Sequence, residues 1–420
     1  MGSEKTNKPK RRFKGFNDAW EQRKLGDIAI YRRGSFPQPY GKSEWYDGED
    51  AKPFVQVADV TDAMNLVDDT KQKISKLAQP MSVFAEKGSV LVTLQGSIGR
   101  VAITQYGAFV DRTVLIFEKY KTEIDNLFWA YVIKQKFIEE ARKAPGGTIK
   151  TITKEALSDF DLLLPNYNEQ CAIGLYFKNL DHLITLHQRK LDKLKNMKKS
   201  YLSEMFPQEG EIKPKRRFAG FTDAWEQREL GSLVIDHNAG IYISKEDYGS
   251  GTNVIGVGNI YDNDIFDGEI YRLGPVNDDR FLLEENDLIY GESSLVPEGI
   301  ARTVCVGKNG VGSAFAWHTR RVKLDQSLVN SHFVTLELNY NIAIRKYLMS
   351  VSTQTALTGM TTEGYFGATL VLPSVNEQAV ISEFFKNLDH LITLHQRKLE
   401  KLKNMKKANS DYLRCCYRLA

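Results

Sequence analysis

The sequence of 420 residues has little that would direct a chain to a membrane or out of the cell. No apolar run approaches the roughly 18 residues that a membrane-spanning helix needs. Residues 1–12 lack the apolar stretch of a signal peptide. The four cysteines show neither a CxxC pair nor the spacing of a metal site. We therefore expect a reduced, cytoplasmic protein with no membrane partner.

The signatures of common enzymes are missing as well. The twelve prolines include no adjacent pair, which excludes the Asn/Asp-Pro-Pro-aromatic tetrapeptide of a methyltransferase. Neither a nuclease-type Pro-Asp…Asp/Glu-x-Lys cluster nor a G-x-S-x-G nucleophile elbow is evident. Six residues separate Gly34 from Gly41, whereas a phosphate-binding P-loop requires four. The sequence therefore predicts a chain without catalysis of its own.

Net charge is low, at +4, and is weak evidence for a polyanionic partner. Its distribution is more informative, because residues 185–217 hold ten Lys or Arg against four Asp or Glu. Such a basic band is compatible with nucleic acid, although a solvated helix face produces the same pattern. The chain is too long for one ordinary core, so we expect two or more domains.

The most prominent feature of the sequence is an internal repeat. Residues 9–26 return as residues 214–231 with three changes, and residues 177–199 return as residues 385–407 with one change. The offsets are 205 and 208 residues. The chain therefore consists of two tandem halves, each with an opening motif, a variable interior and a closing helix.

The two interiors differ in sequence but show a similar order of elements. Short apolar or alternating runs predict strands, and apolar residues at helical spacing predict helices. The predicted strands are residues 53–60, 89–94 and 112–118 in the first interior and residues 253–260, 287–290 and 300–306 in the second. The predicted helices are residues 123–142 and 338–348. The expected fold class is α+β.

Each closing helix follows a Pro-x-x-Asn-Glu-Gln segment, in which Asn168 and Asn376 are the expected N-caps. Apolar residues then recur at spacings of four and three over more than four heptads, which indicates a coiled-coil seam. The predicted seam consists of Phe177, Leu180, Ile184, His187, Leu191 and Leu194 in the first helix and Phe385, Leu388, Ile392, His395, Leu399 and Leu402 in the second.

The four histidines of the two helices admit a second interpretation. His182, His187, His390 and His395 would form a metal cluster if they met between the helices. No carboxylate or cysteine pattern supports zinc, so we interpret His187 and His395 as polar seam residues that determine the register. We expect no metal site.

Segment lengths favour antiparallel packing of the two long helices. A helix of about 38 residues spans about 57 Å, whereas the connection at residues 206–217 reaches only about 40 Å when extended. Antiparallel packing keeps each interior beside the start of its own helix. The predicted parts are a first globular domain at residues 1–165, a long helix at 166–206, a linker at 207–217, a second globular domain at 218–373, and a second long helix with a tail at 374–420.

Loops of both interiors contain side chains suited to DNA. Arg and Gln make bidentate contacts with guanine and adenine edges, and Ser, Thr and glycine backbone suit phosphates. A solvated loop position is the simpler explanation for any single residue, so the prediction concerns the set. The candidates are Arg32, Arg33, Lys42, Gln95, Ser97, Arg100, Lys143, Thr148 and Lys150 in the first interior and Tyr242, Lys245, Arg302, Arg320, Arg321, Gln354 and Thr358 in the second.

The ordered combination of these motifs resembles the specificity subunit of a type I restriction–modification system. The resemblance lies in the paired FxGFxxAWExxxLG motifs at residues 13–26 and 218–231, the Pro-x-x-Asn-Glu-Gln helix starts and the paired LDHLITLHQRKL helices. It covers essentially the whole chain. Residues 408–420 depart from the corresponding segment of the first half.

This resemblance implies two target recognition domains separated by two helices in an antiparallel coiled coil. Each domain would read one half of a split sequence in double-stranded DNA. The implied partners are two modification (methyltransferase) subunits and, for cleavage, two restriction (motor-nuclease) subunits. S-adenosylmethionine, ATP and magnesium chemistry would belong to those partners, so no cofactor is expected in this chain.

Two alternatives belong to other classes of protein. A self-contained DNA-modifying enzyme would require a catalytic site that matches no standard motif. A coiled-coil scaffold with two protein-binding modules would have no DNA role, and the Arg, Gln and Gly of the loops argue mildly against it.

Overall fold

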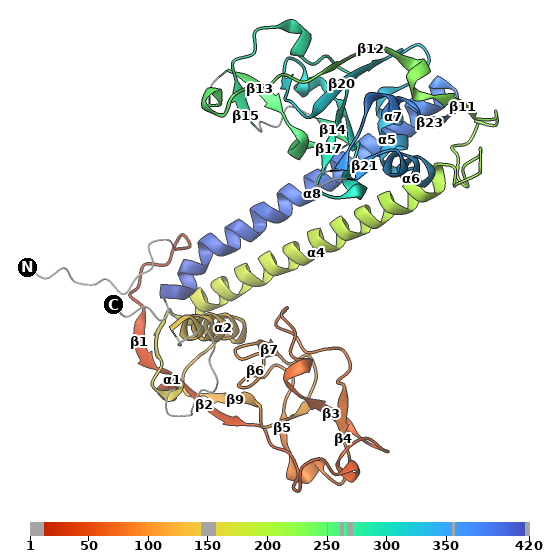
Figure 1. Cartoon of the computed structure of the whole chain (residues 1–420). Helices are drawn as coiled ribbons and strands as arrows, with labels where there is room; N and C mark the ends of the chain where they lie inside the picture. The colour runs from red at the N-terminus through yellow and green to blue at the C-terminus, as the bar shows by residue number, and fades with distance from the viewer. Residues whose placement is uncertain are drawn as a thin grey trace, which may run out of the picture. The chain divides into compact units, whose positions relative to one another are not determined.

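The computed structural model describes residues 12–143, 157–249, 251–260, 264–266, 272–354 and 358–415. The chain divides into a first unit, Met1–Arg189 with Gln396–Ala420, and a second unit, Lys190–His395. Each unit combines small sheets and helices with one half of each long helix, α4 (Tyr167–Met205) and α8 (Val375–Cys415) (Figure 1). No helix among the described residues is long and apolar enough to cross a membrane.

Two four-stranded sheets form most of the first unit, in the strand orders β2-β9-β6-β7 and β4-β3-β8-β5. Helix α2 (Asn126–Lys143) packs on β6 and β7 and confirms the predicted helix. The predicted strands appear as β3, β6 and β9. The elements before α2 are β1 (Glu21–Lys24), α1 (Leu25–Ile28), β2 (Ala29–Arg33), β3 (Lys52–Val55), β4 (Gln72–Ile74), β5 (Val83–Ala85), β6 (Val90–Thr93), β7 (Val101–Ile103), β8 (Ala108–Val110) and β9 (Val114–Tyr120).

The core of the first unit lies between the β2-β9-β6-β7 sheet, α2 and the first turns of α4. Trp129 of α2 is fully buried, and its ring meets Phe117 and Tyr120 of β9 edge to face at centroid distances of 5.3 and 5.6 Å. Phe177 of α4 is 1% exposed and joins the same cluster. Burying each such side chain contributes about 1.5–3 kcal/mol, so the helix start and the sheet are held together.

A five-stranded sheet of order β12-β20-β16-β18-β14 is the largest sheet of the second unit. Two three-stranded sheets, β15-β13-β19 and β17-β22-β21, accompany it. The predicted strands appear as β13, β16 and β18. The strands are β11 (Glu226–Glu229), β12 (Val234–Ala239), β13 (Thr252–Ile255), β14 (Ile265–Phe266), β15 (Arg272–Gly274), β16 (Leu288–Gly291), β17 (Ser293–Ser294), β18 (Thr303–Val306), β19 (Ala314–Phe315), β20 (Thr319–Leu324), β21 (Thr353–Gln354), β22 (Thr358–Gly359) and β23 (Thr369–Leu372).

The single helix predicted at residues 338–348 is wrong, because two helices meet there. Helix α5 (Ser331–Tyr340) ends before Asn341, whose side-chain oxygen accepts hydrogen bonds from the first turn of α6 (Ile342–Ser350). Asn is a strong N-cap because its side chain satisfies amides that lack a helical partner. A third short helix, α7 (Thr362–Phe366), follows. Helix α5 is buried on nearly every side.

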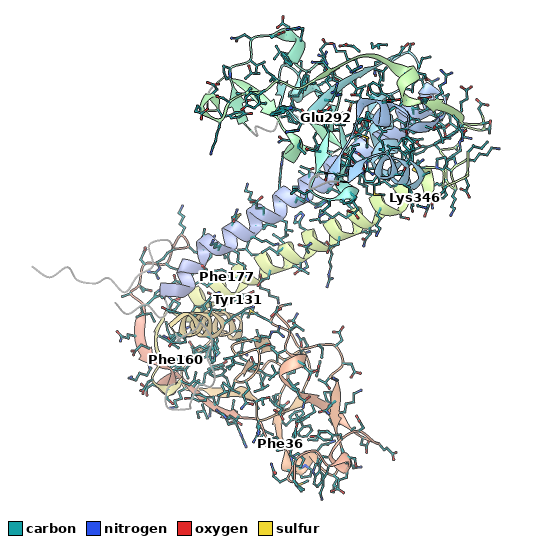
Figure 2. The ribbon with its side chains drawn as sticks, viewed as in Figure 1. Phe36, Tyr131, Phe160, Phe177, Glu292 and Lys346 are labelled. Atoms are coloured by element: carbon teal, nitrogen blue, oxygen red, sulfur yellow. The ribbon has the colours of Figure 1, made fainter. Side chains whose placement is uncertain are left out.

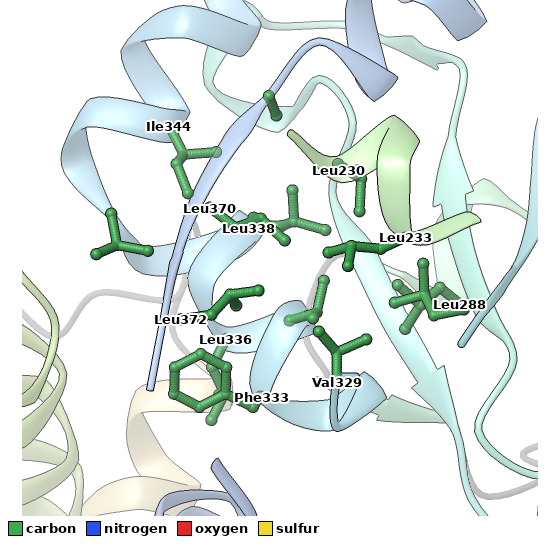
Figure 3. Packing of buried hydrophobic residues seen from close by; sticks show 14 of the residues in the cluster. Leu230, Leu233, Leu288, Val329, Phe333, Leu336, Leu338, Ile344, Leu370 and Leu372 are labelled. Atoms are coloured by element: carbon green, nitrogen blue, oxygen red, sulfur yellow. The ribbon is translucent and has the colours of Figure 1, made fainter. Parts of the chain in front are cut away.

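Figure 3 shows the core of the second unit around α5. Phe333, Leu336 and Leu338 of α5 lie among Leu288 of the sheet and Leu370 of β23. All five side chains are fully buried. Because α5 carries apolar residues on several faces, its sequence has little amphipathic period, which explains why its start was missed.

The long helices begin two residues earlier than predicted. The N-caps are Asn166 and Ser374, whose side chains accept hydrogen bonds from the backbone N–H of Glu169 and Glu377 at 2.9 and 3.4 Å. Asn168 lies inside the first turn of α4, as Asn376 does in α8. The residue directly after each proline is therefore the cap.

Each opening motif is bound to its long helix through a buried carboxylate. Glu169 accepts hydrogen bonds from Arg12 Nε and Nη2 at 2.9 and 2.5 Å. Glu377 accepts the same two contacts from Arg217 at 2.8 and 2.6 Å. Both carboxylates are at most 1% exposed. Breaking a buried pair of this kind costs about 3–5 kcal/mol, so the motif is anchored.

The glutamine of the same segment joins the long helix to the interior. Gln170 accepts a hydrogen bond from Asp125 N–H before α2 and donates one to Pro165 O. In the second unit, Gln378 makes the equivalent contacts with Asn330 and Pro373. Strands close the junction, as β1 pairs with β10 (Asp161–Leu164) and β11 pairs with β23. The two copies of the motif therefore perform the same structural task.

The buried Glu337 of α5 makes the stability of the second unit dependent on pH. Burial raises the pKa of Glu337 from 4.5 to about 8, against a smaller lowering by the Val371 N–H and Asn341. The folded state therefore holds a proton that the unfolded chain releases above pH 4.5. The stabilisation from Glu337 is complete below that pH and is lost as pH rises toward 8.

We predict that Glu337→Gln flattens this dependence. Between pH 5 and 8, the unfolding free energy of the second unit should fall less steeply than in the wild type, by up to about 1.4 kcal/mol per pH unit. Urea denaturation at pH 5, 6.5 and 8 measures the slope. The exposed Glu246 offers the control, since Glu246→Gln should keep the wild-type slope. Equal slopes in both variants would contradict the assignment.

Candidate nucleic-acid interface

One end of the β2-β9-β6-β7 sheet gathers loops from distant parts of the first interior. Strands β2 and β6 end where β9 and β7 begin, because each neighbouring pair is antiparallel. The register pairs Arg33 with Leu115 and Thr93 with Val114. We call this end the loop edge of the first sheet.

Four of the predicted DNA-binding residues lie at this loop edge, and two separate segments, the end of β2 and the β6–β7 loop, supply them. Arg33 ends β2, Gln95 and Ser97 follow β6, and Arg100 precedes β7. All except the half-buried Arg100 are exposed, and Arg100 Nε lies 3.1 Å from Asp62. The structure therefore brings together side chains that the sequence indicated only as a set.

The remaining candidates of the first interior are more scattered. Arg32 lies one residue further into β2 and faces Glu118 at 3.8 Å. Lys42 lies in the loop after β2, where it contacts Glu44 at 3.0 Å and the ring of Trp45. The side chain of Lys143, which ends α2, and the whole of Thr148 and Lys150 lie outside the described residues.

The five-stranded sheet of the second unit has an equivalent loop edge. Strands β12 and β16 end there, and β20 and β18 begin there. Tyr242 and Lys245 lie in the loop after β12 and are exposed. Arg320 is the second residue of β20, and its Nε lies 2.7 Å from the carboxylate of Glu292. Thr358 reaches this edge through the pairing of β22 with β17.

Two arginines predicted to contact DNA have internal partners. Arg302 donates to Asp264 and to the hydroxyl of Tyr340, both at 3.3 Å. Arg321 is 6% exposed and donates to Asp236 at 2.8 Å. Thr358 is also buried, and the side chain of Gln354 is outside the described residues. The exposed candidates in this unit are Tyr242 and Lys245.

The prediction omitted the residues of the turns that precede β9 and β20. Arg112 lies in the first of these turns, and Trp317 and His318 lie in the second, and all three are exposed. Arg112 was included in a predicted strand because it begins the run of residues 112–118. No spacing signal marks such a turn, which only the pairing of β9 and β20 with their neighbours defines.

The predicted seam residues lie on the buried side of the long helices. Those below one-tenth exposure are Phe177, Leu180, Leu191, Phe385, Leu388, Ile392 and Leu399. Those that are half-buried are Ile184, His187, Leu194, His395 and Leu402. Leu202 is also buried, at 8% exposure, and was not predicted. The described residues contain no group of three or more His, Cys, Asp or Glu placed to hold a metal ion.

Two contacts in each unit show that the helices run antiparallel there. Besides the ion pairs described next, Tyr201 of α4 packs on Phe384 of α8 in the second unit, and Tyr176 of α4 accepts a hydrogen bond from Asn409 of α8 in the first. In the second unit, Lys198 of α4 lies 2.8 Å from Asp389 of α8. In the first unit, Lys406 of α8 lies 2.5 Å from Asp181 of α4. Each residue of one pair is 208 positions from its counterpart in the other, which is the offset of the sequence repeat. Equivalent residues of the sequence repeat therefore make equivalent ion pairs between the two helices.

Comparison with known proteins identifies the family. A family model described as the type I restriction modification DNA specificity domain matches residues 17–196 and again residues 222–404, which together are well over half of the chain. The chain belongs to this family. Its two matches correspond to the two halves of the repeat, and we call the globular parts the first and second specificity domains.

Known relatives match the chain, one of them over most of its length. The type I restriction enzyme MjaVIII specificity subunit of Methanocaldococcus jannaschii is 20% identical over 401 residues, 92% of this chain and 90% of the relative. The putative MjaX specificity subunit of that organism is 24% identical over 125 residues, 30% of this chain and 29% of the relative. The crystal structure of a type I restriction-modification S subunit from M. genitalium shares the fold, with TM-score 0.61, 14% identity, and coverage of 98% and 100% of the two chains.

Membership of this family confirms the expectation that the chain is a specificity subunit and not the catalytic part of a restriction system. The finding rests on the family.

Lys198 also attaches the second specificity domain to α4. Its ammonium lies 2.7 Å from Asp264, which is 4% exposed and also bound by Arg302. Burial lowers the pKa of Lys198, but the carboxylates of Asp264 and Asp389 outweigh it and the net shift is upward. Burial likewise opposes ionisation of Asp264, and Lys198 and Arg302 hold its pKa below the ordinary value. These groups stay charged in the folded protein.

We predict that Lys198→Met destabilises the second unit strongly, because Asp264 would lose one of its two cationic partners inside the protein. The unfolding free energy should fall by about 3 kcal/mol, as measured by urea denaturation with hydrogen exchange of α5. The matched control is Lys406→Met, whose Asp181 pair is about 30% exposed on both sides. Such a pair contributes at most about 1 kcal/mol. Equal losses in the two variants would refute the role of Asp264.

Proposed function

We propose that each specificity domain reads one half of a bipartite sequence in double-stranded DNA. The observation that carries this proposal is a duplicated frame with different loops. The Arg–Glu and Gln contacts at the helix starts are the same in both units, whereas the loop edges have different side chains. Two domains with the same supporting contacts but different loop side chains are suited to recognise two different half-sites.

The exposed face of the long helices supports a second part of the proposal, the docking of two modification subunits. Leu183 and Leu186 of α4 are 39% and 37% exposed, and their repeats in α8, Leu391 and Leu394, are 43% and 36% exposed. Leucines left in water at repeated positions are typical of a surface that a partner covers. Two copies of one surface would bind two copies of one partner.

Catalysis would then belong to the other subunits of the assembly. Two restriction subunits would join for cleavage, and S-adenosylmethionine, ATP and magnesium would bind to the modification and restriction subunits. The chain itself would supply the sequence information. Because its net charge is only +4, strong DNA binding is expected only in the assembly.

Domain exchange tests the DNA proposal. Replacing residues 27–164 with those of another family member should change one half of the methylated motif and leave the other half intact, since each domain reads separately. Methylome sequencing of cells carrying the complete system gives the motif. The reciprocal exchange of residues 232–373 should change the other half. An exchange that alters both halves would contradict independent reading.

Charge substitution on one helix tests the docking proposal. Leu391→Lys with Leu394→Lys should reduce the number of bound modification subunits from two to one, because the leucines of α4 remain. Native mass spectrometry of the purified assembly counts the subunits. Leu175 provides the control, since it is 54% exposed on α4 but its repeat is Glu383. Leu175→Glu should keep both subunits, and two bound subunits in the double variant would exclude this surface.

A further inference from the structure

The two specificity domains present a turn at the same place on their loop edges. Residues 111–113 form this turn between β8 and β9, and residues 316–318 form it between β19 and β20. Three backbone N–H groups bind around each turn at 2.8–2.9 Å. In the first domain, the N–H groups of Gly34, Ser35 and Leu94 donate to the carbonyl oxygens of Val114, Val110 and Thr113, respectively. In the second domain, the N–H groups of Gly240, Ile241 and Glu292 donate to the carbonyl oxygens of Thr319, Phe315 and His318, respectively.

A glycine brings a second loop against each turn. A Cβ atom at Gly34 would lie 2.1 Å from Val110 O, and one at Gly240 would lie 2.1 Å from Ala316 O. Side chains are therefore excluded at both positions, and the backbone passes directly over the turn. Two residues later the loop supplies an aromatic side chain, Phe36 in the first domain and Tyr242 in the second.

These aromatic rings pack on the corresponding residue of each turn. The guanidinium carbon of Arg112 lies 4.7 Å from the centroid of Phe36. Trp317, the equivalent of Arg112, meets Tyr242 edge to face at 5.2 Å. Trp317 and Tyr242 are 54% and 68% exposed, and Arg112 is exposed. The backbone frame is therefore the same in both domains, and the chemistry that it presents is different.

Arg112 differs from Arg32 and Arg100, two other arginines of its domain. Arg32 faces Glu118 and Arg100 faces Asp62, whereas within the described part of the chain the guanidinium of Arg112 contacts only a ring face. Packing over the ring restrains the guanidinium and leaves its N–H donors available to another partner. In Figure 2, Phe36 lies away from Tyr131 of α2 and Phe177 of α4. The turn is thus clear of the side of the domain that packs on the long helix.

We propose that this turn is the base-reading element of each specificity domain, and that Arg112 binds the major-groove edge of a guanine in the half-site of the first domain. The inference rests on the proposed reading of DNA. The planar fork of Arg matches the O6 and N7 acceptors of guanine, and stacking on Phe36 orients that fork before DNA arrives.

The second domain cannot make the same two-donor contact with guanine, because the indole of Trp317 has a single N–H donor. Trp317 also stacks in parallel on His318, with centroids 4.6 Å apart. The second turn therefore offers aromatic surface, which suits apolar contact with a base such as the thymine methyl group. One difference at equivalent turn positions thus separates the preferences of the two domains.

The test uses the full-length chain assembled with its modification subunits, after methylome sequencing of the wild type and domain exchange have shown which half-site belongs to the first domain. Competition binding with duplexes changed at one base pair at a time measures discrimination. Arg112→Ala should lose about 5- to 150-fold of the preference for one G·C pair in that half-site. The second half-site should be unaffected.

Arg112→Lys separates base reading from simple charge. Lysine keeps the positive charge but not the fork, so the same position should lose discrimination while overall affinity falls less than in Arg112→Ala. Arg23→Ala is the matched control and should leave every position unchanged, because Arg23 lies in β1, outside the sheet that carries the loop edge, and pairs with Glu21 at 2.9 Å. Equal thermal unfolding of all variants shows that the exposed substitutions leave the fold intact.

Three outcomes would overturn the inference about Arg112. They are an unchanged motif in both Arg112 variants, a uniform loss of affinity that Lys restores in full, which indicates a phosphate contact, and a first half-site without any G·C pair. A wild-type assembly that shows no bipartite motif would instead refute the proposed function. The two failures are therefore distinguishable.

Discussion

A buried carboxylate at the start of each long helix is the contact on which the arrangement of each unit depends. Glu169 and Glu377 are bound by Arg12 and Arg217, and the helix N-terminus adds favourable interaction with a negative charge in the first turn. Loss of either partner would leave an unpaired charge in the interior, at a cost of about 3–5 kcal/mol. The opening motif, the strand that it leads into and the long helix therefore keep one geometry in both units.

This common geometry allows the loop edges to differ. The backbone hydrogen bonds of a strand pair can form whatever side chains the adjoining turn carries, whereas the turns between strands project side chains into solvent. The turns at Arg112 and Trp317 illustrate this, since equivalent backbone hydrogen bonds support an arginine in one domain and an indole in the other. The proposed reading of two unlike half-sites would benefit from such a division between frame and loops.

The sequence predicted which types of residue would lie at the loop edges, but it did not predict which individual residues do. Arg33 at the end of β2 and Gln95 and Arg100 in the β6–β7 loop were all predicted, and they lie at one loop edge. Arg302 and Arg321 were selected on the same grounds and are engaged by Asp264 and Asp236 inside the protein. Those carboxylates lie 38 and 85 residues away in sequence, so no local pattern reveals the pairing.

The sequence by itself determined the two halves, the long helices and their seam, because a repeat and a helical period are local properties of the chain. Local rules were less reliable at the ends of elements, as the caps at Asn166, Ser374 and Asn341 show. Only the tertiary structure decided which loop side chains face outward together. Phe36 and Arg112 are 76 residues apart and meet only because β2 pairs with β9. Contacts of that kind depend on strand pairing over long separations, which residue type and spacing do not encode.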